Sequence, residues 1–314
     1  MAVDDSSSEA GDGSPLVRIR SLLPGLARAE QRVAGIVLAD PASIARRSIT
    51  EVAEAAGTSE TTVTRFCKAI GVGGYPDLRI ALAADTARTS ERDRDLGGDI
   101  EPDDDLAQII EKVAYADAKA VEETAGQLDA EALAAVVDAV ARARRIDVYG
   151  VGASAFVALD LQQKLHRIGL TCFAWSDTHT ALTSAALLRD GDVAIGISHT
   201  GATSETVEAL REAGRHGAVT AALTNFSRSP ITEIAGNVLT TAVRETTYRS
   251  GAMASRLGQL TVIDCLFIGV AQRHIDDTKA ALEATYAAVD GHRLGARPDR
   301  RRHPDRPRNE EDAG

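Results

Sequence analysis

The sequence predicts an all-α domain followed by an α/β domain that contains a five-stranded, doubly wound parallel sheet. Apolar residues recur at helical spacing from about residue 16 to 86, with no strand-like alternation between them. From residue 146 the pattern changes to short apolar runs separated by amphipathic stretches, and these runs cover 146–150, 172–175, 193–198, 219–224 and 238–243. Strands that alternate with helices in this way form parallel sheets covered by helices on both faces.

The chain of 314 residues divides into five parts. Residues 15–90 form the helical domain, 91–108 a charged linker, and 109–290 the α/β domain, which begins with a further helical stretch. Residues 1–14 and 291–314 are rich in Gly, Pro and charged residues and contain almost no large apolar side chains. Such segments cannot offset the entropy cost of ordering by burying apolar surface, so both are expected to be disordered tails.

The net charge of −11 excludes a wholly basic, histone-like nucleic-acid coat, because attraction to phosphates is the sequence-independent part of nucleic-acid binding. The charge is distributed unevenly, however. Residues 15–90 contain ten Lys and Arg against seven Asp and Glu, whereas residues 91–290 contain 18 against 30. If the protein binds DNA, the DNA is expected to meet the helical domain.

Other features exclude further classes of protein. No apolar run reaches the roughly 18 residues that span a bilayer, and the acidic N-terminus does not resemble a secretory signal, so we expect a cytoplasmic protein with no membrane partner. Cys67, Cys172 and Cys265 are widely spaced and fit neither a disulfide framework nor a zinc site. We expect all three to be small buried side chains, and we expect no metal and no cofactor.

The first element of interest is a pair of short helices joined by a tight turn within residues 47–71. Thr50 and Ser59 are predicted to cap the two helices, since a short hydroxyl side chain can accept a hydrogen bond from a helix N-terminus. Gly57 stands where the turn needs a positive φ angle. This spacing is typical of a helix-turn-helix, whose second helix lies in the major groove of DNA.

The predicted second helix has hydroxyl and basic side chains on its outer faces, with Val63, Phe66 and Ile70 facing inward. Short hydroxyls and cations read base edges and hold phosphates. Two further arginines precede the first helix and could clamp the DNA backbone. The candidate DNA-binding residues are Arg46, Arg47, Ser59, Thr61, Thr62, Thr64, Arg65 and Lys68. The alternative is a polar-faced helical hairpin used for dimerisation.

A resemblance favours DNA binding. The stretch from AEQRVAGIVLAD to GVGGYPDLRIAL resembles the N-terminal domain of RpiR-type transcriptional regulators, including the family pattern SxxTVxRFCxxxGxxGY, which is present from Ser59 to Tyr75. Later segments, LTNFSRSPITEIAGNVLTT and RSGAMASRLGQLTVIDCLF, are also similar to RpiR-type chains. The resemblance spans roughly residues 20–285 and implies a DNA-binding regulator.

In the α/β domain, the segment YGVGASA at 149–155 follows the first predicted strand and enters a helix. Gly150 and Gly152 permit close approach of the backbone to an anion, and Ser154 adds a hydroxyl at the helix start, where the helix dipole favours negative charge. The same segment fits a G-x-G-x-x-A form of the dinucleotide fingerprint, so a nicotinamide cofactor is an alternative ligand.

A second loop, ISHTGATSET at 197–206, favours a phosphate over a dinucleotide. It follows the third predicted strand and carries hydroxyl side chains around a glycine, with no Lys or Arg, which suits a phosphomonoester held by neutral donors. A dinucleotide would not need this second loop. Ordinary helix capping is the alternative role for its hydroxyls, and His199 and Glu205 are candidates for contact with sugar hydroxyls or for acid–base work.

The two loops together resemble the SIS, or sugar isomerase, domain of phosphosugar-binding proteins. That resemblance implies phosphate-binding roles for Ser154, Ser198, Thr200 and Thr203, with Gly201 shaping the turn; Thr200 stands where the family commonly has Ser. The full set of candidate phosphosugar-binding residues is Gly152, Ser154, Ser198, His199, Thr200, Gly201, Thr203 and Glu205.

Two functions remain open from the sequence. The favoured one is a regulator of sugar metabolism that binds double-stranded operator DNA as a homodimer or tetramer, with an affinity controlled by a phosphorylated sugar. The alternative is a phosphosugar isomerase with an accessory helical domain. Glu205 and His199 are the only candidate bases on the two loops, and no paired acid and base is evident, so no catalytic residue is predicted.

Overall fold

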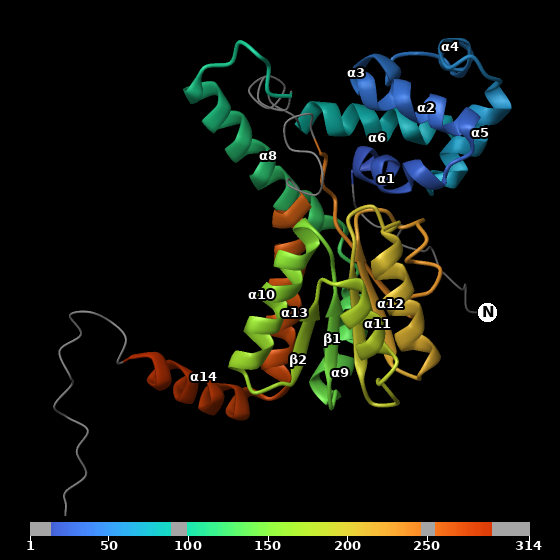
Figure 1. The fold of residues 1–314 in the computed structure, drawn as a ribbon. Coiled ribbons are helices and arrows are strands. Elements are labelled where there is room, and N and C mark those ends of the chain that lie inside the picture. The colour runs from blue at the N-terminus through green and yellow to red at the C-terminus, as the bar shows by residue number, and fades with distance from the viewer. Residues whose placement is uncertain (1–13, 89–98, 246–254, 291–314) are drawn as a thin grey trace, which may run out of the picture.

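The structure, a computed structural model, describes residues 14–88, 99–245 and 255–290. It contains a small helical domain placed over one end of an α/β domain (Figure 1). The tails predicted to be disordered lie outside the described residues, apart from Ser14, as do residues 91–98 of the predicted linker.

The helical domain is built around one apolar core. Its largest buried side chains include Phe66 and Leu78, which show no exposed surface. Its elements are α1 (Pro15–Leu22), the 3₁₀ turn η1 (Leu23–Gly25), α2 (Arg28–Ala39), α3 (Pro41–Ile44), α4 (Ile49–Ala55), α5 (Glu60–Ala69) and α6 (Tyr75–Arg88). Helices α4 and α5 form the predicted pair, and α2 packs against α5 in the same core.

One predicted cap is wrong. Helix α4 begins at Ile49 and is capped by Ser48, whose hydroxyl accepts from the backbone N–H of Glu51. The Glu51 carboxylate in turn accepts a hydrogen bond from the Ser48 N–H at 2.7 Å, so the two residues form a capping box that Thr50 cannot make. The predicted cap of α5 is confirmed, since Ser59 accepts from the Thr62 N–H. Gly57 turns the chain between the two helices with a φ of 58°.

The α/β domain contains a five-stranded, all-parallel sheet with the strand order β2-β1-β3-β4-β5, which confirms the predicted fold class. The strands are β1 (Ile146–Tyr149), β2 (Cys172–Trp175), β3 (Val193–Ile197), β4 (Val219–Thr224) and β5 (Asn237–Thr240). The helices are α8 (Leu106–Gln127), α9 (Ala130–Arg142), α10 (Ala153–Arg167), α11 (Thr178–Ala185), α12 (Ser204–Arg215), α13 (Ser255–Arg273) and α14 (Ile275–Asp290).

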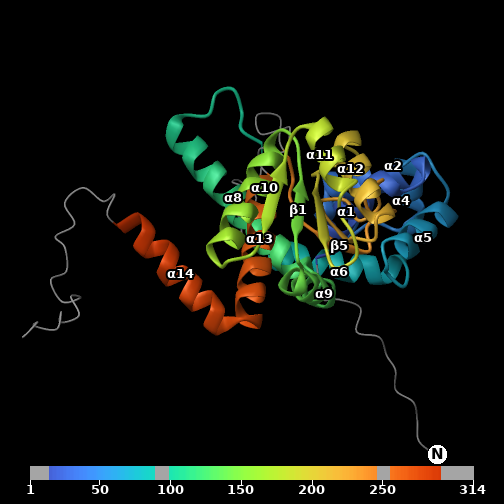
Figure 2. The ribbon, with the colours of Figure 1, turned by 60° about the horizontal axis from the view of Figure 1, so that its bottom comes forward.

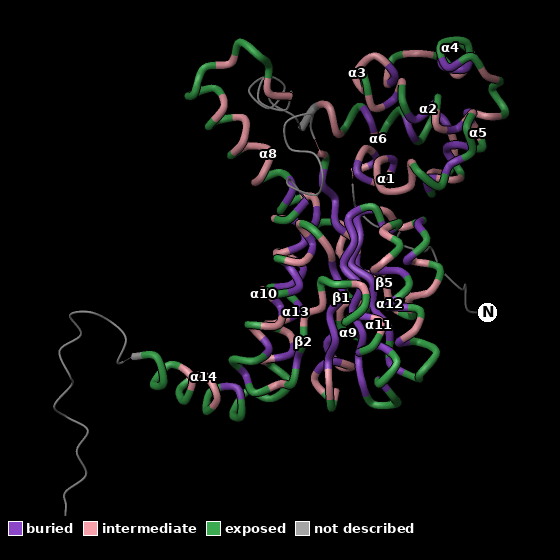
Figure 3. Tube along the Cα trace, viewed as in Figure 1, coloured by how far each residue is buried: buried purple, intermediate pink, exposed green. Residues whose placement is uncertain are grey.

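Helices cover the sheet on both sides, as the apolar strands require. One apolar cluster joins α9, α10 and α13 to one face, and a second joins α11 and α12 to the other. Figure 2, which looks more nearly from the lower end of the molecule, shows α14 extending away from this body. Figure 3 shows that the strands are buried along most of their length, whereas α14 and the first turns of α8 are largely exposed.

The cysteine prediction holds for two of the three residues. Cys67 and Cys172 are buried, but Cys265 lies on an exposed face of α13. Its spacing from the other cysteines said nothing about which face of α13 it occupies, and α13 covers the sheet with the neighbouring face that carries the buried Val262 and Leu266.

Candidate functional site

The strand order places the two predicted phosphate loops next to each other. Strands β1 and β3 are neighbours in the centre of the sheet, while the chain leaves β1 towards β2 on one side and reaches β4 from β3 on the other. Such a reversal of strand order opens a crevice outside the carboxyl ends of the two strands. The loop after β1 leads to Ser154 at the start of α10, and the loop after β3 contains Ser198, so both border this crevice.

The loop after β1 leads directly into α10. Gly152 occupies the cap position of α10 with a φ of 59° and a ψ of −128°, a conformation that is open almost only to glycine. A Cβ atom on Gly150 would lie 2.9 Å from the carbonyl oxygen of Ser154, so the loop is too tight for a side chain there. Ser154 itself is buried in the first turn of α10.

The loop after β3 is held by hydroxyl groups rather than by helix caps. Thr203 occupies the cap position of α12, but its side chain makes no capping hydrogen bond. Its hydroxyl instead lies 2.9 Å from that of the buried Ser198. Thr200 is exposed and accepts from the Ala202 N–H at 3.2 Å. The alternative that these hydroxyls are ordinary caps therefore does not describe Ser198 or Thr203.

Gly201 gives the loop its shape. Its φ is 64°, and a Cβ atom there would lie 2.1 Å from the hydroxyl oxygen of Ser229 and 2.9 Å from that of Thr224. Only glycine fits, because both the backbone angle and the space exclude a side chain. The following helix, α12, begins at Ser204, and its first N–H groups have no acceptor within the helix, which favours an anion at this end.

His199 and Glu205, the two titratable side chains of this loop, have different environments. His199 is 9% exposed, and burial lowers its pKa, while Glu245, whose Oε1 lies 3.9 Å from Nε2, acts in the opposite direction. Glu205 lies in the first turn of α12, where a hydrogen bond from its own backbone N–H and one from the Ser204 hydroxyl lower its pKa. Glu205 is therefore ionised at neutral pH and engaged with its own helix.

Several polar residues near His199 were not predicted. Glu245 accepts from the hydroxyl of the buried Ser255 at 3.3 Å. The Nδ1 atom of His199 and both side-chain polar atoms of Gln259, one turn beyond Ser255 in α13, are buried without a hydrogen-bond partner. These residues come from the loop after β3, the segment after β5 and α13, so no local spacing in the sequence relates them.

The candidate DNA-binding residues have different environments. Thr61, Arg65 and Lys68 are exposed on α5, and Arg46 is exposed before α4. Arg65 also forms an ion pair with Glu30 of α2, with Nη2 and Oε1 at 3.3 Å. The prediction that every hydroxyl of α5 lies on an exposed face needs correction, because Thr62 and Thr64 are only half-exposed.

The hydroxyls of these two threonines already have partners within α5. That of Thr62 lies 3.1 Å from the hydroxyl of the cap residue Ser59, and that of Thr64 donates to the Glu60 carbonyl. Arg47 is half-exposed, and its carbonyl accepts from the Tyr75 hydroxyl at 2.8 Å. The side chains of α5 that are free to reach a base or phosphate are thus fewer than the sequence suggested.

No three His, Cys, Asp or Glu side chains among the described residues come together in a way that could hold a metal ion. Within the same residues, none of the helices has the length and apolar character needed to cross a membrane.

Family models match both parts of the chain. The helix-turn-helix domain of the rpiR family matches residues 14–89, and the SIS domain matches residues 139–269. An HTH-type transcriptional regulator of Caldanaerobacter subterraneus subsp. tengcongensis, TTE0211, is 42% identical over 270 residues, which cover 86% of this chain and 95% of that protein. The HTH-type regulator YbbH of Bacillus subtilis is 33% identical over 280 residues, covering 89% and 98% of the two chains.

Solved structures of related proteins are similar to this chain as well. The Vibrio vulnificus NanR protein, complexed with ManNAc-6P, superposes with a TM-score of 0.57 at 29% identity and covers 89% of this chain and 100% of its own. The sugar isomerase domain of an RpiR transcription factor from Sphaerobacter thermophilus gives 0.53 at 31% identity, covering 57% and 99%. With both domains matched in order and relatives similar along nearly their whole length, the chain belongs to the rpiR family of helix-turn-helix transcriptional regulators that carry a SIS domain.

Proposed function

We propose that the helical domain of this regulator binds double-stranded operator DNA, and that a phosphorylated sugar bound between the loops after β1 and β3 changes the affinity for that DNA. The observation that carries the proposal is the pairing of the Ser198 and Thr203 hydroxyls at a helix N-terminus, beside the loop of Ser154. NanR, whose structure holds ManNAc-6P, supports a sugar phosphate as the class of ligand.

The phosphate would be held by neutral donors. Ser154, Ser198 and Thr203 supply hydroxyls, and the first turns of α10 and α12 supply N–H groups and the positive ends of their dipoles. The exposed hydroxyl of Thr200 lies at the rim of the same loop. The sugar moiety would extend towards polar groups such as His199.

The isomerase alternative is not supported. The relatives that match along most of their length are named transcriptional regulators. Glu205, one of the two candidate bases, is ionised and bonded to Ser204 in its own helix turn, as a capping residue would be.

DNA binding is tested by replacing two exposed cationic side chains, one on the proposed recognition helix α5 and one outside it. Replacing Lys68 by Ala should weaken binding to a duplex selected by the unmodified chain, and should reduce the slope of log affinity against log salt by about 1 if one phosphate contact is lost. Arg211→Ala removes the same charge from the exposed face of α12 and should leave the slope unchanged. Equal salt slopes for the two variants would contradict the assignment of α5 as the helix that contacts DNA.

Effector binding is tested separately. Ser198→Ala should abolish the rise in melting temperature produced by sugar phosphates, with ManNAc-6P as the first probe, and leave DNA affinity intact in the absence of effector. Saturation at 100 times the dissociation constant adds about 2.7 kcal/mol to the unmodified chain, which is easily measured. The effector-domain assignment fails if Ser198→Ala responds to the same sugar phosphate as the unmodified chain.

A second copy of the chain is proposed to cover one face of α10. Phe156 and Leu159 stand three residues apart on this helix and are 64% and 51% exposed. Helix α10 begins at the loop of Ser154, so the interface would adjoin the effector site. Phe156→Glu should lower the mass seen in light scattering, converting a dimer into monomers or a tetramer into smaller species; an unchanged mass would place the interface elsewhere.

A further inference from the structure

The loop that follows β4, residues 225–231, packs directly against the candidate effector loop. The Asn225 N–H donates to the carbonyl of His199 at 3.0 Å, and the Ile231 N–H donates to the carbonyl of Gly201 at 2.9 Å. Between these two bonds Ser229 fills the space beside Gly201 so closely that no Cβ atom would fit. The effector loop cannot change its backbone position without moving this loop or breaking both hydrogen bonds.

The same loop contacts the helical domain on its other side. The hydroxyls of Ser227 and Ser21, the latter in α1, lie 3.0 Å apart. A Cβ atom on Gly25 of η1 would lie 2.6 Å from the Cβ of Arg228, so the Arg228 side chain packs against the η1 backbone at a distance that only glycine permits. These contacts join segments that are about two hundred residues apart in the chain.

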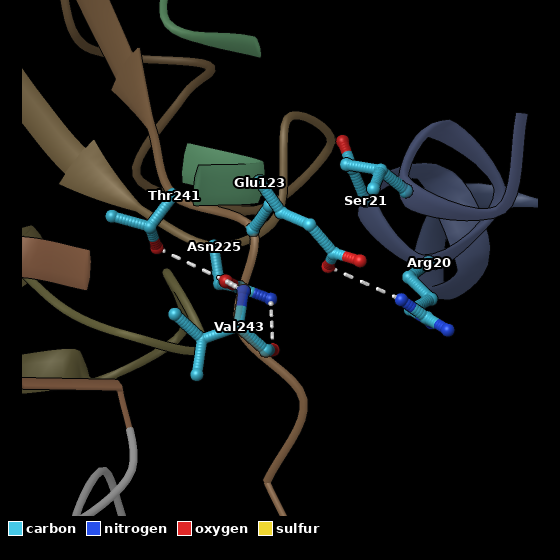
Figure 4. Close-up of a pocket in the computed structure, with 8 residues that line it drawn as sticks. Arg20, Ser21, Glu123, Asn225, Thr241 and Val243 are labelled. Atoms are coloured by element: carbon cyan, nitrogen blue, oxygen red, sulfur yellow. Dashed lines mark hydrogen bonds and ion pairs between the residues drawn. The ribbon is translucent and has the colours of Figure 1, made fainter. Parts of the chain in front are cut away.

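An ion pair spans this contact between the domains. The Arg20 guanidinium, in α1, lies 3.3 Å from the Glu123 carboxylate in α8, and the two side chains are 32% and 17% exposed. Figure 4 shows the pair beside Asn225, whose amide donates to the carbonyl of Val243. The carbonyl oxygen of that amide accepts from the Thr241 hydroxyl, so the base of the contact is a connected polar network.

Helix α1 belongs to the core of the DNA-binding domain. Ile19 is fully buried in the same apolar cluster as Phe66 of α5. A shift of α1 therefore carries the recognition helix with it. Figure 1 shows α1 facing the α/β domain, with α4 and α5 on the outer side of the helical domain. The contact thus sets the direction of α5 without covering it.

We infer that residues 225–231 couple the two sites: this loop docks the DNA-binding domain through Ser21, Gly25 and the nearby Arg20–Glu123 pair, and the effector loop controls that docking. The inference rests on the proposed function and specifies its mechanism. The docked arrangement holds α5 in the orientation that binds DNA. A ligand that moves residues 198–201 releases α1, and loosening α1 in turn loosens the effector loop, because coupling between sites is reciprocal.

Hydrogen exchange on the full chain, without DNA or effector, tests the link directly. Gly25→Ala should push η1 away from Arg228 and speed exchange of the Asn225 and Ile231 amides at least about fivefold, the lower end of ordinary coupling. Gly35→Ala is the matched control, since nothing lies within 4 Å of its added methyl group. Equal exchange at these amides in the two variants would overturn the inference.

Two charge variants repeat the test without changing the backbone. Glu123→Gln removes the charge that pairs with Arg20 and should speed the same amides. Glu122→Gln removes a neighbouring charge whose side chain is 76% exposed and pairs with Lys119, and should not.

A disulfide provides the opposite perturbation. Cysteines replacing Ser21 and Ser227, in a chain that also carries Cys265→Ser, should form a bond because their side-chain oxygens already lie 3.0 Å apart. The oxidised chain should exchange the Asn225 and Ile231 amides more slowly than the unmodified chain, and dithiothreitol should reverse the effect. Exchange unaffected by oxidation would count against the inference.

DNA affinity completes the test and separates the two levels of the argument. On a duplex selected by the unmodified chain, Gly25→Ala should bind at least about fivefold more weakly than Gly35→Ala. If the chain binds DNA and responds to sugar phosphates but these two variants bind equally, the coupling loop is refuted and the proposed function stands. A chain that selects no duplex refutes the proposed function, and the exchange experiment then still decides whether the loop links the two domains.

Discussion

Gly201 and Gly191 offer a matched pair of alanine substitutions in the α/β domain. Both have positive φ angles, 64° and 85°. They differ in the space around them: a Cβ atom on Gly201 would lie 2.1 Å from the Ser229 hydroxyl oxygen and 2.6 Å from the Ser229 Cβ, whereas a Cβ atom on Gly191 would meet nothing within 4 Å. The pair therefore separates the cost of backbone strain from the cost of overpacking.

The magnitudes follow from these two differences. A non-glycine residue in the left-handed region costs about 1–2 kcal/mol, and both substitutions carry that cost. Overpacking adds about 1–3 kcal/mol for Gly201 alone. We expect Gly201→Ala to be less stable than Gly191→Ala by about 1–3 kcal/mol. With a urea dependence of about 2 kcal/mol per molar, its midpoint should be about 0.5–1.5 M lower.

The fluorescence of Trp175, the single tryptophan of the chain, follows unfolding of the α/β domain in urea. The same samples should show that Gly201→Ala no longer responds to a sugar phosphate, whereas Gly191→Ala, at the turn before β3, responds as the unmodified chain does. Equal urea midpoints, or an effector response retained by Gly201→Ala, would refute the assignment of a tightly shaped loop at this site.

Three further outcomes are expected. Ser48→Ala should destabilise α4 by about 1 kcal/mol through loss of its cap, seen as faster amide exchange within that helix. Iodoacetamide should label Cys265 in the native chain but Cys67 and Cys172 only after denaturation, because burial raises their pKa values to about 11 and about 12. Burial lowers the pKa of His199, so as the pH falls this imidazole is protonated in the unfolded chain before it is protonated in the folded chain. The free energy of unfolding should therefore decline below about pH 6.5, and decline less in His199→Gln. Urea titrations at pH 7.5 and 5.5 measure both.

The sequence predicted the sheet well because its strands are continuous apolar runs. Such runs are buried on both faces of a parallel sheet, and most of the residues that bound the observed strands are polar or glycine. The predicted runs and the observed strands accordingly differ by a few residues at their ends, as for β1, which ends at Tyr149 instead of Gly150. The cap of α4 was misplaced although the pattern Ser48-x-x-Glu51 was present in the sequence, because Thr50 is also of a residue type that caps helices.

The contacts of the site were beyond prediction for a different reason. Each proposed phosphate loop has a local signature of glycine and hydroxyl residues, but the groups that surround it come from distant segments. Arg20 and Glu123, or His199 and Glu245, are brought together by the docking of whole elements, and no periodicity relates them. The exposure of Cys265 is a similar case, since it depends on which face of α13 meets the sheet.

The charge distribution has opposite consequences for the two ligands. Residues 15–90 are net positive and should bind DNA less tightly as salt rises, because counterions compete for the phosphates. Residues 91–290 contain twelve more acidic than basic residues, and neither of the proposed phosphate loops contains Lys or Arg, so a sugar phosphate that binds there would enter against a repulsive field. Salt screens that repulsion, while the hydrogen bonds inside the loops are shielded from it. Effector affinity, measured by calorimetry between 50 and 300 mM KCl, should therefore rise or stay level while DNA affinity falls, and a parallel fall of both would show that unrecognised cations hold the phosphate.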